Sequence, residues 1–290
     1  MDIPKIFQEL LDSGFTFTEN SLSYYSSGQA GSIYTLTKGE ISLLAKVYAQ
    51  SDGYNRMTAE AEGLRILRQT NTVNIPEIYF SDQLNSGSLL IMEYLKSGRQ
   101  QKKSMSQLGT QLAQLHLSAT ESYFGLNRNN YIGALDQFNE PYKKWSAFYF
   151  KCRLQPQIDM AISSGLLPRD TISSEDDWIE IIDEIYPKEQ PSLIHGDLWG
   201  GNVVTDVTGS PFLIDPAVAY SHRELDIAMS KLFGGFTEDF YAAYHEVYPL
   251  AEGFYERIEL SQLYYLLVHV NLFGNSYVSQ TRTLLRQYFG

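Results

Sequence analysis

The sequence has little cysteine, few basic residues and no long apolar run, and each of these shortages excludes a class of protein. Cys152 is the only cysteine among 290 residues, which excludes an intrachain disulfide and a cysteine-rich metal site. Lys and Arg number 22 against 34 Asp and Glu, giving a net charge of −12. This acidic balance argues against nucleic acid as a partner, because phosphate backbones attract basic surfaces.

No apolar stretch is long enough to cross a membrane, so we expect no membrane partner. Residues 1–5 lack the basic and apolar regions of a secretory signal, and a cytoplasmic location is therefore the simplest expectation. With 43% hydrophobic and 19% charged residues, the composition is typical of a globular protein. The length suffices for one large or two modest domains.

The most informative segment is residues 193–202, followed by Asp215. In kinases, an Asp base precedes an Asn metal ligand by five residues, and a second metal-binding Asp follows after a hairpin. Asp197 and Asn202 have this spacing, and a turn at residues 206–209 between two apolar stretches predicts the hairpin. The alternative is an ordinary loop in which Asp caps a turn and Asn adopts a left-handed backbone.

These residue types suit phosphoryl transfer. A hydroxyl that attacks a γ-phosphorus needs a carboxylate to orient it and to accept its proton, the role predicted for Asp197. Mg²⁺ prefers oxygen ligands, which Asn202 and Asp215 supply. The sequence therefore predicts ATP and Mg²⁺ as cofactors, and the combination of residues favours this interpretation over a structural loop.

Apolar patterns predict an α+β protein with a bilobal, protein kinase-like fold. A short helix over residues 3–12 precedes short strands. The predicted strands cover 21–27, 32–38, 41–48, 75–80 and 88–94, with a helix over 55–69. The pattern then becomes helical, with helices over 141–164, 174–186, 224–233 and 258–273. We expect residues 1–95 to form a nucleotide-binding lobe with a five-stranded antiparallel sheet, and residues 96–290 a larger helical lobe with the catalytic hairpin and the acceptor site.

A nucleotide site needs a turn whose backbone can approach phosphates. Gly28, Gly31 and Ser32 lie at the turn between the first two predicted strands, although glycine-rich hairpin turns are common without this function. Lys46 lies among apolar neighbours on the third strand and is predicted to contact the α- and β-phosphates. The alternative for Lys46 is an edge lysine that extends to solvent.

The helix after Lys46 should carry its carboxylate partner. Glu60 and Glu62 both qualify, and Glu60 is preferred because it precedes Leu64 by one helical turn on the inward face. The end of the fifth strand should lend backbone groups to adenine, and this hinge consists of Met92, Glu93, Tyr94 and Leu95.

Two further residues have two open interpretations. Asp226 could accept backbone N–H groups from the catalytic loop, or could be a surface charge or an acid at a helix N-terminus. His116, between two leucines of a predicted helix, is interpreted as a packing histidine rather than a catalyst.

Residues 195–202, His-Gly-Asp-Leu-Trp-Gly-Gly-Asn, resemble the signature of the fructosamine kinase, or ketosamine-3-kinase, family, a relative of the aminoglycoside phosphotransferases. Trp199 is the most distinctive residue of this signature. Other matching residues and segments are 60–64, 112–116, Phe124, Gly125, Asn130, Ile132, Gly133, Gln137, Asn139, Trp145, Phe148, Arg153, Leu154, 215–217, Tyr220 and 222–226. The resemblance covers most of the chain.

The resemblance implies transfer of the γ-phosphoryl of ATP to the 3-hydroxyl of a ketosamine such as fructosamine or ribulosamine. The phosphorylated adduct then decomposes and frees the amine, which amounts to deglycation of a protein or small molecule. The implied roles are base for Asp197, Mg²⁺ ligands for Asn202 and Asp215, phosphate clamp for Lys46 and its partner for Glu60. Acceptor binding or support is implied for His195, Trp199, Glu224 and Asp226.

The chain departs from the family pattern at several points. Ser221 stands where members often have glycine, residues 139–141 lack an aromatic, and no cysteine in the phosphate turn supports a redox-linked dimer. Two alternatives stay open: a kinase of an aminoglycoside, choline-like or other sugar acceptor, and a pseudokinase that only binds. The retained Lys46, Asp197, Asn202 and Asp215 argue against the pseudokinase. The sequence does not identify the natural acceptor, and it is compatible with a monomer without fixing the oligomeric state.

Overall fold

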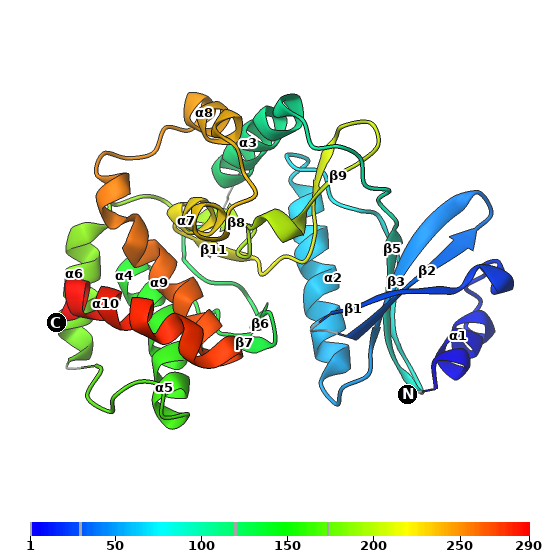
Figure 1. The fold of residues 1–290 in the computed structure, drawn as a ribbon, viewed down its shortest axis with the longest axis horizontal. Helices are drawn as coiled ribbons and strands as arrows, with labels where there is room; N and C mark the ends of the chain where they lie inside the picture. Colours follow the sequence, from blue (N-terminus) through cyan, green and yellow to red (C-terminus); the bar gives the residue numbers. More distant parts are fainter. Residues whose placement is uncertain (1, 29–30, 119–120, 173) are drawn as a thin grey trace. The chain divides into compact units, whose positions relative to one another are not determined.

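A computed structural model describes residues 2–28, 31–118, 121–172 and 174–290 (Figure 1). They form two compact units. The first contains Met1–Gln100 and Val204–Asp215, and the second contains Gln101–Val203 and Pro216–Gly290. The predicted domain boundary at residues 95 and 96 stays a proposal.

The first unit contains the predicted five-stranded antiparallel sheet. Its order is β1 (Ser23–Gly28), β2 (Gly31–Lys38), β3 (Ile41–Tyr48), β5 (Gly87–Glu93) and β4 (Ile78–Leu84). The strand predicted over 75–80 begins later and continues to Leu84. The shift has a physical reason, since Pro76 has no N–H to donate to a strand ladder.

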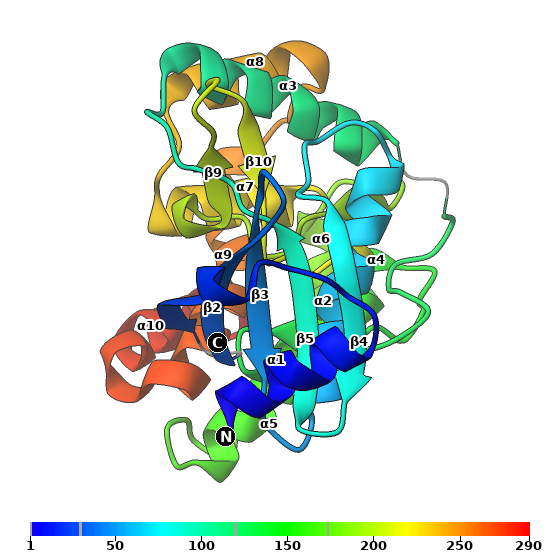
Figure 2. The same ribbon diagram turned by 90° about the vertical axis from the view of Figure 1, so that its right-hand side faces the viewer.

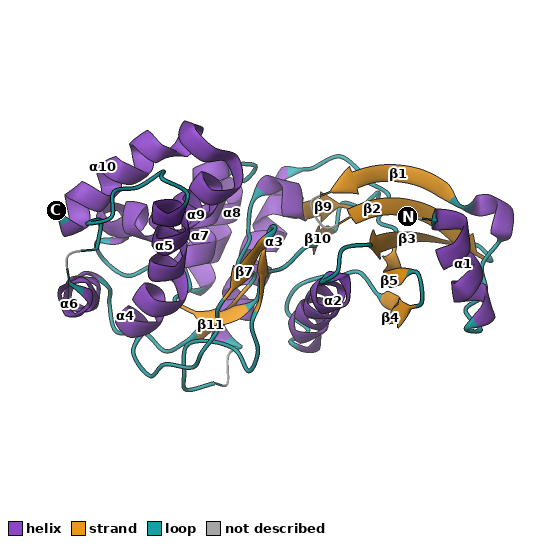
Figure 3. Ribbon diagram, turned by 90° about the horizontal axis from the view of Figure 1, so that it is seen from below, coloured by secondary structure: helices purple, strands orange, loops and turns teal. Residues whose placement is uncertain are grey.

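Two helices, α1 (Ile3–Asp12) and α2 (Gly53–Gln69), cover opposite faces of this sheet (Figures 2 and 3). Ile6, Phe7 and Leu10 of α1 pack in one core with Leu43, Ala45 and Val47 of β3, as well as with β2 and β5. Because side chains alternate along a strand, the intervening β3 residues, Lys46 among them, face α2. The core pattern of β3 thus determines the face on which Lys46 lies.

The second unit is mainly helical, as predicted. Its helices are α3 (Lys102–Leu117), α4 (Trp145–Phe148), α5 (Gln155–Ser163), α6 (Glu175–Ile185), α7 (Glu224–Phe233), α8 (Glu238–Val247), α9 (Phe254–Phe273) and α10 (Val278–Phe289). Two antiparallel strand pairs accompany them: β6 (Asn130–Ile132) with β7 (Leu135–Gln137), and β8 (Ser192–Ile194) with β11 (Ala219–Ser221). The β6–β7 pair was not among the predicted strands.

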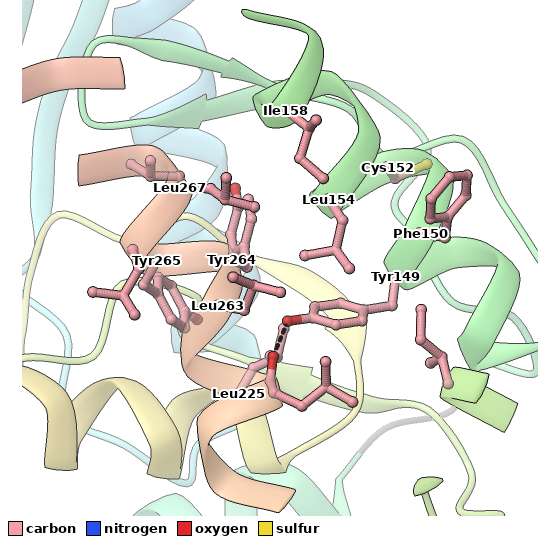
Figure 4. Packing of buried hydrophobic residues seen from close by; sticks show 14 of the residues in the cluster. Tyr149, Phe150, Cys152, Leu154, Ile158, Leu225, Leu263, Tyr264, Tyr265 and Leu267 are labelled. Atoms are coloured by element: carbon pink, nitrogen blue, oxygen red, sulfur yellow. Dashed lines mark hydrogen bonds between the residues drawn. The ribbon is translucent and has the colours of Figure 1, made fainter. Parts of the chain in front are cut away.

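Helix α9 forms the centre of the second unit and is buried over most of its length (Figure 4). Leu263 and Leu267 pack in one cluster with Leu154 and with Leu225 of α7. Tyr149 Oη donates a 2.5 Å hydrogen bond to the carbonyl of Leu260 within this core. The apolar character of residues 258–273 in the sequence is explained by this central position.

The hairpin predicted after the catalytic loop is present as β9 (Val203–Thr205) and β10 (Pro211–Leu213). Its turn is closed by the carboxylate of Asp206, which accepts the N–H groups of Thr208 and Ser210. Within the described residues, none of the helices combines the length and apolarity needed to cross a lipid bilayer.

Candidate active site

Lys46 on β3 meets two carboxylates in the first unit. Its Nζ lies 2.7 Å from Glu60 Oε1 on α2 and also hydrogen-bonds Asp215 Oδ1. Burial by itself would lower the pKa of Lys46, but the charges of Asp215 and Glu60 outweigh it and raise that pKa. Lys46 is therefore protonated and fixed in position by its two carboxylate partners. It pairs with Glu60, the glutamate that is preferred over Glu62 on the sequence.

Tyr48 completes this cluster and was missed by sequence reasoning. Its hydroxyl donates to Glu60 Oε2, while Lys46 occupies Oε1, so both carboxylate oxygens of Glu60 are fixed. Tyr48 is buried and lies two residues after Lys46, hence on the same face of β3. The alternation of side chains along the strand was the sequence signal that could have placed Tyr48 beside Lys46.

Asp215 has a left-handed backbone, with φ of 53°. Such a conformation is uncommon outside glycine, costs of order 1–3 kcal/mol and occurs disproportionately at functional sites. The preceding strand β10 is held by Asn74, whose Nδ2 donates to Pro211 O and whose carbonyl accepts from Leu213 N. The carboxylate of Asp215 is thus presented from an anchored segment.

The predicted phosphate turn lies where β1 meets β2, with Gly28 paired to Gly31. Gln29 and Ala30 lie outside the described residues. Gly31 has φ of 147°, and a Cβ added to it would lie 1.9 Å from the carbonyl oxygen of Val47. Glycine is therefore required here by the close approach of β3. Ser32 follows, paired with Val47.

The predicted hinge consists of Met92, Glu93, Tyr94 and Leu95, and it follows the end of β5. Glu93 and Tyr94 already donate their N–H groups to carbonyls of the same unit, those of Glu77 and Ser42. In the described part of the chain the N–H of Leu95 donates to no protein group. Leu95 is therefore the hinge residue with a backbone donor to offer a ligand.

The catalytic loop of the second unit holds Asp197 by its neighbours. Asn202 Nδ2 donates to the carbonyl oxygen of Asp197 at 2.8 Å and to its Oδ2 at 2.9 Å. The N–H of Asp197 donates to Nδ1 of the buried His195 at 3.3 Å. Backbone and carboxylate of Asp197 are both oriented by residues of the same loop.

Asp226, near the start of α7, lies beneath this loop and is completely buried. Its two carboxylate oxygens accept the backbone N–H groups of His195 and Gly196, each at 2.8 Å. His116 Nε2 lies 3.2 Å from Asp226 Oδ2, and its Nδ1 lies 2.8 Å from the hydroxyl of Tyr244. Asp226 therefore anchors the loop through the backbone N–H groups of the loop. His116 is buried behind Asp226 and supports its carboxylate.

Trp199 and Glu224 have different surroundings. Trp199 is 41% exposed, and its ring packs so closely on Gly201 that a Cβ added to Gly201 would lie 2.3 Å from the ring. Glu224 is completely buried and paired with Arg257 through Nε at 2.9 Å and the terminal nitrogen at 2.5 Å. Trp199 is available to a ligand, whereas Glu224 has a supporting position.

The structure thus places two sets of predicted site residues. Lys46, Glu60 and Asp215 meet in the first unit, together with the phosphate turn and the hinge. Asp197, Asn202, His195 and Asp226 meet in the second unit, with Trp199 on the same loop. A kinase needs both sets, one for the nucleotide and one for proton transfer.

The family model for fructosamine kinase matches residues 2–290. The chain belongs to the fructosamine kinase family. It is 33% identical over 286 residues to the ketosamine-3-kinase of Mus musculus, covering 88% of this chain and 90% of that protein. It is 34% identical over 276 residues to the chloroplastic protein-ribulosamine 3-kinase of Oryza sativa subsp. indica, covering 93% of this chain and 75% of that protein.

Solved structures agree with this family. The assigned fructosamine-3-kinase of Haemophilus somnus 129PT is 29% identical with a TM-score of 0.86, over 98% of this chain and 97% of that one. Aminoglycoside phosphotransferase APH(4)-Ia, crystallised with AMP-PNP and hygromycin B, has a TM-score of 0.63 at 16% identity, over 99% of each chain. The latter likeness shows the fold alone, and it confirms the predicted kinase-like fold. As a fructosamine kinase family member, the chain is an ATP-dependent phosphotransferase.

Proposed function

We propose that this protein transfers the γ-phosphoryl of ATP to a sugar hydroxyl of a ketosamine, the adduct of a fructose- or ribulose-type sugar with an amine. The observation that carries the proposal is the loop in which Asn202 holds the carboxylate of Asp197 at 2.9 Å, within a chain that matches the family over residues 2–290. Phosphorylation destabilises the adduct, so the consequence is deglycation.

Asp197 is the proposed general base. It orients the attacking hydroxyl and accepts its proton as the bond to the γ-phosphorus forms and the bond to the ADP oxygen breaks. Asp197 can accept this proton only when its carboxylate faces the attacking hydroxyl. Asn202, His195 and Asp226 supply that orientation through the contacts described above.

The first unit supplies the proposed nucleotide site. Lys46, kept charged and fixed by Glu60, clamps the α- and β-phosphates, and the backbone at Gly28, Gly31 and Ser32 covers them. The N–H of Leu95 donates to the adenine, next to Met92, Glu93 and Tyr94. Together these groups account for ATP as the phosphoryl donor.

Asn202 and Asp215 are the proposed Mg²⁺ ligands. The amide nitrogen of Asn202 is used by Asp197, so a cation would meet its oxygen, and Asp215 contributes a carboxylate that is 44% exposed. Among the described residues no group of three or more His, Cys, Asp or Glu forms a metal cluster. Mg²⁺ in kinases does not need one, because phosphate oxygens and water complete its shell. When bound, Mg²⁺ would neutralise charge on the phosphates.

The proposed acceptor is a ketosamine on a cationic amine such as lysine. Trp199, exposed beside Asp197 in the sequence, offers a flat wall for a sugar ring. The net charge of −12 attracts cationic amines over anionic ones. A cytoplasmic site of action stays a prediction.

The experiment is ATP consumption by the purified protein with Mg²⁺, comparing fructoselysine and ribuloselysine with choline, aminoglycosides and no acceptor. Turnover that depends on a ketosamine supports the proposal. Turnover with choline or an aminoglycoside instead would move the acceptor class and keep the mechanism. ATP binding without turnover on any of these acceptors would favour a non-catalytic role.

A further inference from the structure

The hairpin formed by β6 and β7 carries two buried amides that face each other. Asn130 and Gln137 are directly paired across the two strands, and they are only 5% and 2% exposed. Gln137 Nε2 donates to Asn130 Oδ1 at 2.8 Å. Buried amides need hydrogen-bond partners for their polar atoms. The other hydrogen bonds of Asn130 and Gln137 therefore identify the segment to which the hairpin is attached.

Both amides donate to the same short segment, which lies 80 or more residues away in the sequence. Gln137 Nε2 donates to the carbonyl of Ala217 at 3.0 Å, and Asn130 Nδ2 donates to the carbonyl of Val218 at 2.9 Å. Ala217 and Val218 follow Asp215 in the chain and lead into β11. The amide pair thus fixes two consecutive peptide groups just after a proposed metal ligand.

The other side of this segment touches the catalytic loop. The N–H of Ala217 donates to the carbonyl of His195 at 2.9 Å. Gly196 has φ of 85°, and a Cβ added to it would lie 2.0 Å from the carbonyl oxygen of Ala217. The peptide of Ala217 is therefore held between Gln137 on one side and the His195–Gly196 backbone on the other.

The amide pair is itself oriented by buried groups. Tyr264 Oη donates to Gln137 Oε1 at 2.8 Å, and Asn139 Nδ2 donates to Asn130 Oδ1 at 2.8 Å. Arg153, 1% exposed, donates to Asn139 Oδ1 at 2.8 Å and to the carbonyls of Phe138 and Cys152.

The burial of Arg153 in this network costs folding free energy. Its hydrogen-bond acceptors, the side-chain oxygen of Asn139 and two backbone carbonyls, are all uncharged, and its guanidinium carbon lies over the rings of Phe148 and Tyr264, 4.6 Å and 5.5 Å from their centroids. Burying a cation without a counter-charge costs stability, so stability alone does not explain the network. The network ends at the carbonyls of Ala217 and Val218, which indicates that it positions this segment.

We propose that Gln137 and Asn130 are positioning residues for phosphoryl transfer: their amides lock the Ala217–Val218 peptides against the catalytic loop. This inference rests on the proposed function, because it assigns the locked loop the role of presenting Asp197. Both amides are buried, so we assign them an indirect role and no contact with substrate. A misplacement of about 1 Å at a reacting group costs on the order of 100-fold in rate, so a lost lock acts on turnover rather than on ATP binding.

The test compares Gln137→Glu with Asn271→Asp. Gln137→Glu replaces a donor by oxygens that repel the carbonyl of Ala217. Asn271→Asp is the matched control: Asn271 Nδ2 also makes two bonds, to the carbonyl and Oε1 of Gln157, but they join α9 to α5 away from the loop. Tyr264→Phe removes only the hydroxyl that orients Gln137 and keeps the packing, so it serves if Gln137→Glu does not fold.

We expect kcat to fall about tenfold or more in Gln137→Glu and several-fold in Tyr264→Phe, with KM for ATP within about twofold of wild type. Asn271→Asp should keep kcat within about twofold even where it lowers Tm as much. Unchanged kcat in folded Gln137→Glu and Tyr264→Phe would overturn the inference, as would an equal loss of kcat in Asn271→Asp.

Amide hydrogen exchange gives a readout that does not depend on the acceptor. Peptides covering residues 195–202 and 215–221 should exchange faster in Gln137→Glu and Tyr264→Phe, and not in Asn271→Asp. Unchanged exchange in these peptides would refute the positioning role even if no acceptor were turned over. A wild-type protein that is inactive on ketosamines, yet shows the expected exchange, would refute the proposed function and not the lock.

Discussion

The side-chain nitrogen of Asn202 donates hydrogen bonds to two oxygens of Asp197. One is the main-chain carbonyl oxygen at 2.8 Å and the other is a carboxylate oxygen at 2.9 Å. A proposed metal ligand and the proposed base are therefore oriented by one contact. Rotation of either side chain would break it, so the loop has one geometry in which both residues are placed for phosphoryl transfer.

Asp197→Asn should remove turnover while leaving the nucleotide bound. The amide has the same shape but cannot accept the proton of the attacking hydroxyl, and general bases typically contribute about 10²- to 10⁴-fold. Steady-state kinetics and ATP titration check this. Asp183→Asn is the control, because the carboxylate of Asp183 accepts a bond from Ser146 in the same unit and is not part of the catalytic loop. Turnover within about tenfold of wild type in Asp197→Asn would exclude Asp197 as the base.

Glu60→Gln should weaken the use of ATP by about tenfold in kcat/KM, because the neutral amide no longer fixes the charge of Lys46. Glu62→Gln changes the same functional group two residues away and should have an effect of about twofold or less. The measurement is ATP-dependent kinetics at saturating acceptor. Equal losses in the two variants would mean that the Lys46–Glu60 contact has no specific role.

Asp226→Asn should destabilise the second unit by about 2–4 kcal/mol. One carboxylate oxygen that accepts an N–H is replaced by an NH₂ group that cannot, and bonds to buried charges are worth about 1.5–3 kcal/mol each. All 3 tryptophans lie in the second unit, so tryptophan fluorescence during urea denaturation reports on it. Asp176→Asn, at an exposed helix start, should change stability by about 0.5 kcal/mol or less. Wild-type stability in Asp226→Asn would contradict the anchoring role.

The Glu189–Arg223 pair should make stability dependent on pH in the acid range. Burial raises the pKa of Glu189, but the hydrogen bonds from Arg223, both at 2.8 Å, and the positive charges of Arg223 and Arg257 outweigh it, so the net pKa is lowered. A lowered pKa in the folded state contributes stability that is present above the ordinary glutamate pKa and is lost as pH falls through the folded value.

Glu189→Gln removes this contribution. The difference in unfolding free energy between wild type and Glu189→Gln should be largest near neutral pH and should shrink as the pH is lowered below the ordinary glutamate range. Denaturation curves at a series of pH values measure it. A difference that stays constant from neutral to acid pH would show that the ionisation of Glu189 does not stabilise the fold.

Local patterns in the sequence were enough to predict most of the fold. Alternation in residues 41–48 and the helical period of residues 3–12 and 55–69 match β3, α1 and α2 closely. The β6–β7 hairpin was missed because its strands are three residues each and carry buried amides instead of alternating apolar residues. Its order comes from tertiary hydrogen bonds, which no local pattern records.

The candidate site divides in the same way. The predicted partnership of Lys46 with Glu60 follows from strand and helix periods, and the structure shows that contact. The support of Asp226 by His116 and Tyr244 joins three segments far apart in the sequence, and only folding brings them together. The roles of the site residues in catalysis stay predictions for the experiments above.

The most direct test of the ketosamine kinase proposal is ATP turnover with fructoselysine and with its 3-deoxy analogue, measured side by side with Asp197→Asn as the blank. We predict that fructoselysine is consumed with one ADP formed per amine released, and that the 3-deoxy analogue and the variant give no turnover. Equal turnover of the two compounds, or turnover of neither while choline or an aminoglycoside is phosphorylated, would contradict the proposal.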